Sequence, residues 1–363
     1  MTELDTQTTP TPRPPRVDFG HRTVVVRRGP VAVRWRTRTV IVCSIFTVLT
    51  FAVTVWALML GDYPLTFAQV WAALTGDPDA GFARTVVVGW RAPRAVAAVV
   101  FGAALGASGA VFQSLTRNPL ASPDIIGFST GSYTGALIVI ILIHGSYLEL
   151  AGGAILGGIA TAALVYVLAW RRGVQGFRLI IVGIAVSAVL GSFNTWLMLK
   201  ADLEVAMSAA VWGAGSLNGT NWEQVLYGGA IIVVLLAGIA ALAPGLQQLQ
   251  LGDDAAKATG TRAEPVRLGI MVLGVALVAV VTAAAGPISF IALAAPQIAR
   301  RIARTPGVTV APAAFMGALM LAAADVIAQH LLPVSLPVGV VTVVVGGAYL
   351  VWLIIREIRR RAV

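Results

Sequence analysis

The chain has 363 residues, of which 58% are hydrophobic and only 12% are charged, and its formal net charge is +10. So apolar a composition excludes an ordinary soluble protein. Residues 39–60 carry no charged side chain, and a helix of that length crosses a hydrocarbon core of roughly 30 Å. Similar runs recur along the chain and predict an all-α polytopic membrane protein.

Ten membrane-spanning helices are predicted from these runs. They lie at about 39–60, 93–113, 125–143, 148–170, 178–199, 223–243, 265–285, 288–302, 311–330 and 337–355. With the N-terminus inside, 22 of the 26 Lys and Arg residues fall in inside segments, and the outside segments hold the other four, Arg84, Arg91, Arg94 and Lys200. This asymmetry follows the positive-inside rule and predicts that both termini are cytoplasmic. The basic balance therefore reflects topology, and no nucleic-acid partner is expected.

Residues 1–38 precede the first span and carry eight arginines among several Pro and Thr residues. We expect a disordered, lipid-facing cytoplasmic tail, followed by a permease domain at 39–363. The pattern of polar and apolar residues in "RTVVVRR", from Arg22 to Arg28, indicates a short strand within this tail.

Two outer stretches are longer than tight turns. Residues 61–92 contain "LTFAQVWAAL", which predicts a short amphipathic helix against the bilayer, and residues 200–222 have room for another. Glycines four residues apart predict close helix packing within the spans. They are Gly102, Gly106 and Gly109 in the second span, and Gly153 and Gly157 in the fourth.

A polar elbow, "FQSLTRNPLASPD", interrupts the apolar pattern at 112–124, on the predicted inner side. Pro119 and Pro123 stop helix formation and restrict the residues before them. Asn118 and Asp124 are expected to bond the freed backbone, with Asp124 as the N-cap of the next helix.

Residues 243–265 form a second polar inner stretch, bounded by prolines and rich in helix formers. The sequence predicts two short helices here, joined at Gly252 and together covering about 246–262. A channel has no obvious use for such an element, so it is a candidate surface for a protein partner.

Several kinds of chemistry are poorly supported. A P-loop needs Gly-Lys followed by Ser or Thr, and neither Lys200 nor Lys257 has that context. Metal-ligand clusters and nucleophilic triads are not recognisable, so no catalytic or metal-binding residue is expected. Asp325 is the one good candidate for a carboxylate deep in a span. A secondary transporter or channel acting alone would depend on such a group, and that alternative stays open.

Four stretches resemble the FecCD-type permeases, the membrane subunits of ABC importers for ferric siderophores, haem and cobalamin. They are "RAPR" (91–94), "ALGASGAVFQSLTRNPLASPDIIGFSTG" (104–131), "LGDDAAKATG" (251–260), and "GPISFIALAAPQIAR" (286–300) with "AADVIAQ…LPVGVVTVVVGG" (323–347). Together with their spacing they extend over about 270 of the 363 residues. The form "APQIAR", with Gln297, is most similar to the ferric-enterobactin-type branch.

The resemblance implies the type II ABC importer permease fold in the cytoplasmic membrane. It further implies two permease subunits, identical or related, an external substrate-binding protein and two ATPase subunits. The chain itself would be no enzyme and would bind no cofactor, because ATP would be used by the ATPase subunits. The expected cargo is a ferric siderophore, with haem or cobalamin as alternatives.

Site residues are implied by the same resemblance. ATPase coupling falls on Leu251, Gly252, Asp253, Asp254, Ala255, Lys257 and Gly260, for which the alternative is a solvated loop. Docking of the binding protein falls on Arg91 and Arg94, for which the alternative is headgroup contact. A third outer arginine of some relatives is Gln329 here, with His330 beside it. The cytoplasmic gate falls on Asn118, Leu120, Gly176 and Phe177, for which the alternative is a structural turn.

Overall fold

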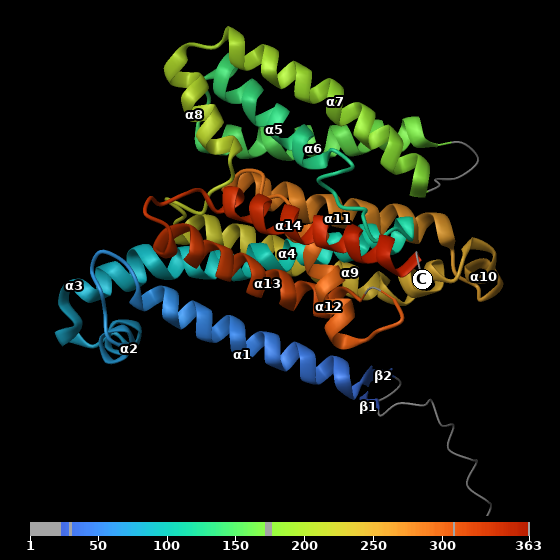
Figure 1. The fold of residues 1–363 in the computed structure, drawn as a ribbon, viewed down its shortest axis with the longest axis horizontal. Helices are drawn as coiled ribbons and strands as arrows, with labels where there is room; N and C mark the ends of the chain where they lie inside the picture. The colour runs from blue at the N-terminus through green and yellow to red at the C-terminus, as the bar shows by residue number, and fades with distance from the viewer. Residues whose placement is uncertain (1–22, 29–30, 171–175, 308, 362–363) are drawn as a thin grey trace, which may run out of the picture.

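The structure is a computed structural model, and it describes residues 23–28, 31–170, 176–307 and 309–361. Long helices run side by side along the molecule (Figure 1). Helix α10 (Asp253–Ala258) and the C-terminus lie at one end, which we call the α10 end. Helix α2 (Phe67–Thr75) lies at the opposite end, which we call the α2 end.

A β-hairpin precedes the first span. Strand β1 (Thr23–Arg28) pairs with strand β2 (Val31–Arg36) in antiparallel register, from Thr23 opposite Arg36 to Arg28 opposite Val31. The predicted strand is confirmed, whereas the expectation of disorder is wrong for these twelve positions, because β-branched residues such as Val favour strand pairing. Residues 1–22 of the predicted tail lie outside the described residues.

Each of the ten predicted spans contains helix. The helices are α1 (Thr37–Met59), α4 (Ala92–Thr116), α5 (Phe128–Ile138), α6 (Tyr147–Ala169), α7 (Gly176–Lys200), α9 (Trp222–Gln250), α11 (Ala263–Ala285), α12 (Ile291–Ala303), α13 (Val310–Val326) and α14 (Val338–Arg361). Helices η1 (Pro78–Ala80), α3 (Gly81–Arg84) and η2 (Thr85–Arg91) lead into α4, while η3 (Val139–Ile143) extends α5 and η4 (Ile327–Leu331) extends α13. Seven of the described helical segments are long and apolar enough to cross a membrane. Helix α12 has 13 residues and is about 20 Å long, so it begins three residues later than the span predicted at 288–302. A helix of this length does not by itself cross a hydrocarbon core of roughly 30 Å.

Both predicted outer helices are confirmed. Helix α2 begins with a capping box between Thr66 and Gln69, which fixes its first turn. Helix α8 (Leu203–Gly213) occupies the second outer stretch.

Glycine contacts bring α4 and α13 together. A side chain at Gly102 would collide with the backbone of Gly317, and one at Gly106 with the backbone of Ala313. Gly109 lies in the same way against Ala292 of α12. The backbones touch directly, as predicted for small residues four apart.

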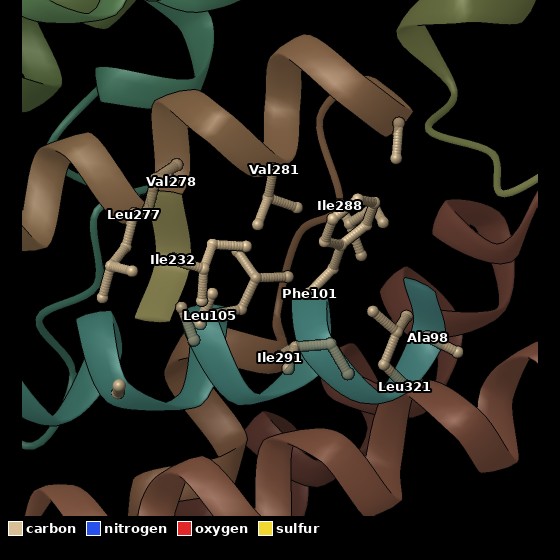
Figure 2. Packing of buried hydrophobic residues seen from close by; sticks show 14 of the residues in the cluster. Ala98, Phe101, Leu105, Ile232, Leu277, Val278, Val281, Ile288, Ile291 and Leu321 are labelled. Carbon is tan, nitrogen blue, oxygen red and sulfur yellow. The ribbon is translucent and has the colours of Figure 1, made fainter. Parts of the chain in front are cut away.

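Helix α4 lies at the centre of the largest core cluster (Figure 2). Phe101 and Leu105 of α4 are fully buried, and they lie among Ile232 of α9, Leu277 of α11 and Leu321 of α13. This helix is packed on all sides, so the position of its last turn is fixed. The chain therefore leaves the helix from a fixed point.

Candidate functional site

The elbow begins where α4 ends. Arg117 adopts a left-handed backbone with φ of 51°, which turns the chain out of the helix after Thr116. The Asn118 side-chain oxygen then accepts a hydrogen bond from the Leu120 backbone N–H at 2.9 Å, as predicted for an asparagine in a turn. The Leu120 side chain is 40% exposed. The two predicted gate residues therefore stand together on one tight turn.

Asp124 has a different role from the predicted N-cap. Helix α5 begins four residues later, after Gly127, which has φ of 95°. The carboxylate instead accepts from Ser129 Oγ at 2.6 Å and from the Phe290 backbone N–H at 3.3 Å, at the start of α12. Burial raises the pKa of the Asp124 carboxyl to about 6, and the two hydrogen bonds oppose that rise. The elbow is thereby tied to the break before α12.

The second predicted gate stretch meets the elbow at its beginning. A side chain on Gly176 would come within 2.6 Å of Thr116 Cα, so α7 starts in backbone contact with the end of α4. Phe177 follows with 74% of its surface exposed. Gly176 and Asn118 thus lie on adjoining segments, although 58 positions separate them in the chain.

The predicted coupling segment contains one short helix rather than two. Helix α9 continues through Pro244 to Gln250, because buried Leu246 and Leu249 hold its last turns against the bundle. Helix α10 follows, and Gly252 and Gly260 on either side of it have φ of 116° and 81°, as predicted for turn glycines.

The other predicted coupling residues lie on or beside α10. Leu251 is 71% exposed, and Asp254, Ala255 and Lys257 are exposed as well. Asp253 is the first residue of the helix. Asp254, Ala255 and Lys257 therefore form an exposed surface with two charged groups on a short helix.

The predicted docking arginines are engaged within the chain. Arg94 makes a bidentate ion pair with Asp325 of α13, at 2.6 and 2.8 Å, and also donates to the Asn218 side chain. Arg91 donates to the backbone carbonyls of Leu58 and Tyr63 at 2.9 and 2.8 Å. Both guanidinium groups therefore fix the α2 end of the bundle.

The ion pair with Arg94 accounts for the presence of a carboxylate, Asp325, in an apolar helix. Its side chain is 9% exposed and that of Arg94 is 20% exposed, so the carboxylate is paired and shielded. The sequence singled out Asp325 as a candidate for a carboxylate in the membrane, but it gave no indication of a partner 231 positions away.

A buried glutamine pair was missed by sequence reasoning. Gln297 of α12 donates to Gln113 of α4 at 2.5 Å, and Gln113 donates to the Leu293 carbonyl at 3.0 Å. Pro296 lies inside the same helix and leaves the Ala292 carbonyl without its helical donor, one position before the Leu293 carbonyl that Gln113 contacts. The proline inside an apolar helix was the signal that could have found the pair.

Within the described part of the chain, no three His, Cys, Asp or Glu residues come close enough to hold a metal ion.

Comparisons with known proteins agree with this arrangement. The chain matches the model of the FecCD transport family over residues 49–356. It is 48% identical over 325 residues to the ferric enterobactin transport system permease protein FepG of Escherichia coli (strain K12), across 89% of this chain and 98% of that protein. It is 36% identical over 281 residues to the iron(3+)-hydroxamate import system permease protein FhuG of Bacillus subtilis (strain 168), across 75% and 84%.

A solved structure supports the same assignment. It is described as an inward-facing conformation of a metal-chelate type ABC transporter, and it matches with a TM-score of 0.77 and 28% identity over 87% of this chain and 99% of that one. The resemblance seen in the sequence motifs is confirmed by the family match and by this fold. The chain belongs to the FecCD transport family and is a membrane permease.

Proposed function

We propose that this chain is the permease subunit of an ATP-driven importer that carries a ferric siderophore of the enterobactin type across the cytoplasmic membrane. The observation that carries the proposal is the 48% identity to FepG over nearly the whole length of both proteins. A hydroxamate chelate, haem or cobalamin is the alternative cargo.

Topology follows from the charge distribution. We place the α10 end in the cytoplasm, because that orientation puts 22 of the 26 Lys and Arg residues inside and both termini with them. The α2 end then faces outward, where a binding protein delivers the cargo.

Two ATP-hydrolysing subunits would dock at the α10 end, and a second permease subunit, identical or related, would complete the pathway. Exposed Asp254 and Lys257 on α10 offer charge-assisted contacts to such a partner. The permease itself would hold no cofactor, since ATP would be bound and hydrolysed by the partner.

Docking of the binding protein would use Arg91 and Arg94, together with the surface around them. Arg94 keeps 20% of its side-chain surface accessible while paired with Asp325. An acidic group on the binding protein would contact Arg94 beside Asp325 or compete with Asp325 for it. The contribution of Arg94 alone to binding would therefore be modest.

The cytoplasmic gate would consist of the Asn118–Leu120 turn and the start of α7 at Gly176 and Phe177. These segments adjoin, and their two apolar side chains, Leu120 and Phe177, are exposed. Irregular backbone at membrane depth suits a segment that lines a pathway. Closure would then require only that the two segments approach their counterparts on the second subunit.

Uptake in proteoliposomes tests the function. The full importer, with its ATPase subunits and binding protein, is supplied with ferric enterobactin, a ferric hydroxamate or haem, each labelled with radioactive iron. We expect ATP-dependent accumulation of ferric enterobactin above the other two. A preference for another cargo would contradict the proposed cargo, and accumulation that needs a proton gradient but no ATPase would favour the solitary transporter.

The coupling surface is tested by reversing its charge. Asp253→Arg combined with Asp254→Arg should abolish both ATP hydrolysis stimulated by the binding protein and uptake, while the protein stays folded in the membrane. Lys200→Glu at the opposite end is the control. Uptake that survives the double change would remove α10 from the docking surface.

A further inference from the structure

The last turn of α4 is joined to the end of α9 by a hydrogen bond. Gln250, the final residue of α9, donates from Nε2 to Ser114 Oγ at 3.1 Å, and Ser114 is 4% exposed. The two residues are 136 positions apart. Gln250 stands three positions before the first residue of α10, and Ser114 stands three positions before Arg117, where the chain leaves α4. One bond therefore connects the segment that leads into α10 with the segment that leads into the gate.

Apolar contacts strengthen the same connection. Ala256 is fully buried, and it is the one residue of α10 with a described side chain that is buried. It forms a small cluster with Leu249 and Ala263, and Leu115 of α4 packs against that cluster. Helix α10 thus exposes Asp254 and Lys257, while the Ala256 methyl group packs toward the end of α4.

Leu115 occupies an unusual position among the core clusters. It packs against the small cluster around Ala256, against the central cluster of α4, α9, α11 and α13, and against the cluster between α5, α6 and α7. Closely packed side chains transmit displacement, because interiors at this density have little room to absorb it. A shift of α10 would therefore reach both the central cluster and the cluster between α5, α6 and α7 through the Leu115 side chain.

The chain leaves α4 two residues after Leu115, at Arg117. Thr116 ends α4 in contact with Gly176, and Asn118 and Leu120 form the turn that follows. The end of α4 therefore contacts one proposed gate segment at Gly176 and continues directly into the other, the Asn118–Leu120 turn.

We propose that Ser114, Leu115, Gln250 and Ala256 form a coupling junction that converts a displacement of α10 into a movement of the elbow. Gln250 is a positioning residue in this junction, because it holds the end of α9 to α4 without reaching the cargo pathway. The inference rests on the proposed function, and it adds a route from the ATPase-facing surface to the gate.

The substitution Gln250→Leu keeps the size of the side chain and removes the donor. The importer carrying it should still assemble with its ATPase subunits and hydrolyse ATP. We expect the amount of radioactive ferric enterobactin transported per ATP to fall about fivefold, the factor that corresponds to one neutral hydrogen bond. Ser114→Ala removes the same bond from the other side, so it should give the same loss, and the double variant should be no worse than either single one.

Ser192→Ala is the matched control for Ser114→Ala, since Ser192 is exposed on α7 and its hydroxyl donates to the Ala188 carbonyl of the same helix. Its transport per ATP should equal that of the wild type. Melting temperatures are measured in parallel, because a bond that only stabilises the fold would lower them without changing transport per ATP.

Two results overturn the inference. One is transport per ATP equal to that of the wild type in both Gln250→Leu and Ser114→Ala. The other is a fold-decrease in transport per ATP in the double variant that equals the product of the two single fold-decreases. Failure of the wild-type importer to transport ferric enterobactin with ATP would instead contradict the proposed function, so the two failures are distinguishable.

Discussion

The ion pair between Arg94 and Asp325 should contribute to the stability of the fold as well as to docking. Replacing Arg94 by Ala removes a guanidinium that holds both oxygens of a carboxylate at 2.6 and 2.8 Å. The carboxylate is 9% exposed, so it cannot regain the hydration that it loses. Breaking a buried pair from one side costs about 3–5 kcal/mol, and we expect the lower end, because Arg94 itself is 20% exposed.

The opposite change should cost less. Asp325→Asn leaves Arg94 with the Asn218 contact and with access to solvent, so we expect a loss of about 1–2 kcal/mol. Changing both residues to Ala removes both charges, and its cost should fall below the sum of Arg94→Ala and Asp325→Ala by about 2 kcal/mol.

Thermal unfolding of the purified protein in detergent measures these differences, with binding of the partner protein assayed separately. Arg84→Ala is the control, since Arg84 is exposed on the segment that leads into α4. Strict additivity of the two Ala changes, with melting temperatures like those of the control, would refute the pairing. Loss of partner binding at unchanged stability would leave docking as the sole role of Arg94.

Three further changes test other parts of the structure. Burial raises the pKa of the Asp124 carboxyl from 3.8 to about 6, so the wild-type protein loses stability as the pH rises from about 4 to about 6 and this carboxyl ionises. Asp124→Asn does not ionise, and its stability relative to the wild type should therefore rise by about 3 kcal/mol between pH 4 and pH 8. A difference in melting temperature between the two proteins that does not change with pH would contradict this. Gly106→Ala should cost about 1–3 kcal/mol, because its methyl group would collide with the backbone of α13, whereas Gly191→Ala, in open space, should cost nothing; equal melting temperatures would contradict the close crossing. Gly176→Ala should cost about 1–3 kcal/mol, because its methyl group would come within 2.6 Å of Thr116 Cα, and a melting temperature equal to that of Gly191→Ala would contradict the close contact between α7 and α4.

Local features of the fold were predictable from the sequence because they depend on neighbouring residues. The length and charge of the apolar runs gave the spans, and the spacing of Gly102 and Gly106 gave the close contact that α4 makes. Helix α9 shows where local rules fail. Pro244 suggested an end, but burial of Leu246 and Leu249 continued the helix to Gln250.

The polar contacts of the site could not be predicted from the sequence. Arg94 and Asp325 are 231 positions apart, and Asp124 and Phe290 are 166 apart. Periodicity carries no information about which polar side chain meets which across such distances. Asp124 was expected to cap its own helix, since N-capping is the usual local use of an aspartate after proline, and only the packed bundle places the Phe290 N–H within reach.

Direct backbone contact between α4 and α13 has a mechanical consequence. Where the backbone of α13 lies against the bare Cα atoms of Gly102 and Gly106, no flexible side chain lies between the helices to absorb sliding. The two helices therefore form a stiff lever, with the Arg94–Asp325 pair at one end and the elbow beyond Thr116 at the other. A displacement of the turn after Thr116 would therefore move the Arg94–Asp325 pair with it.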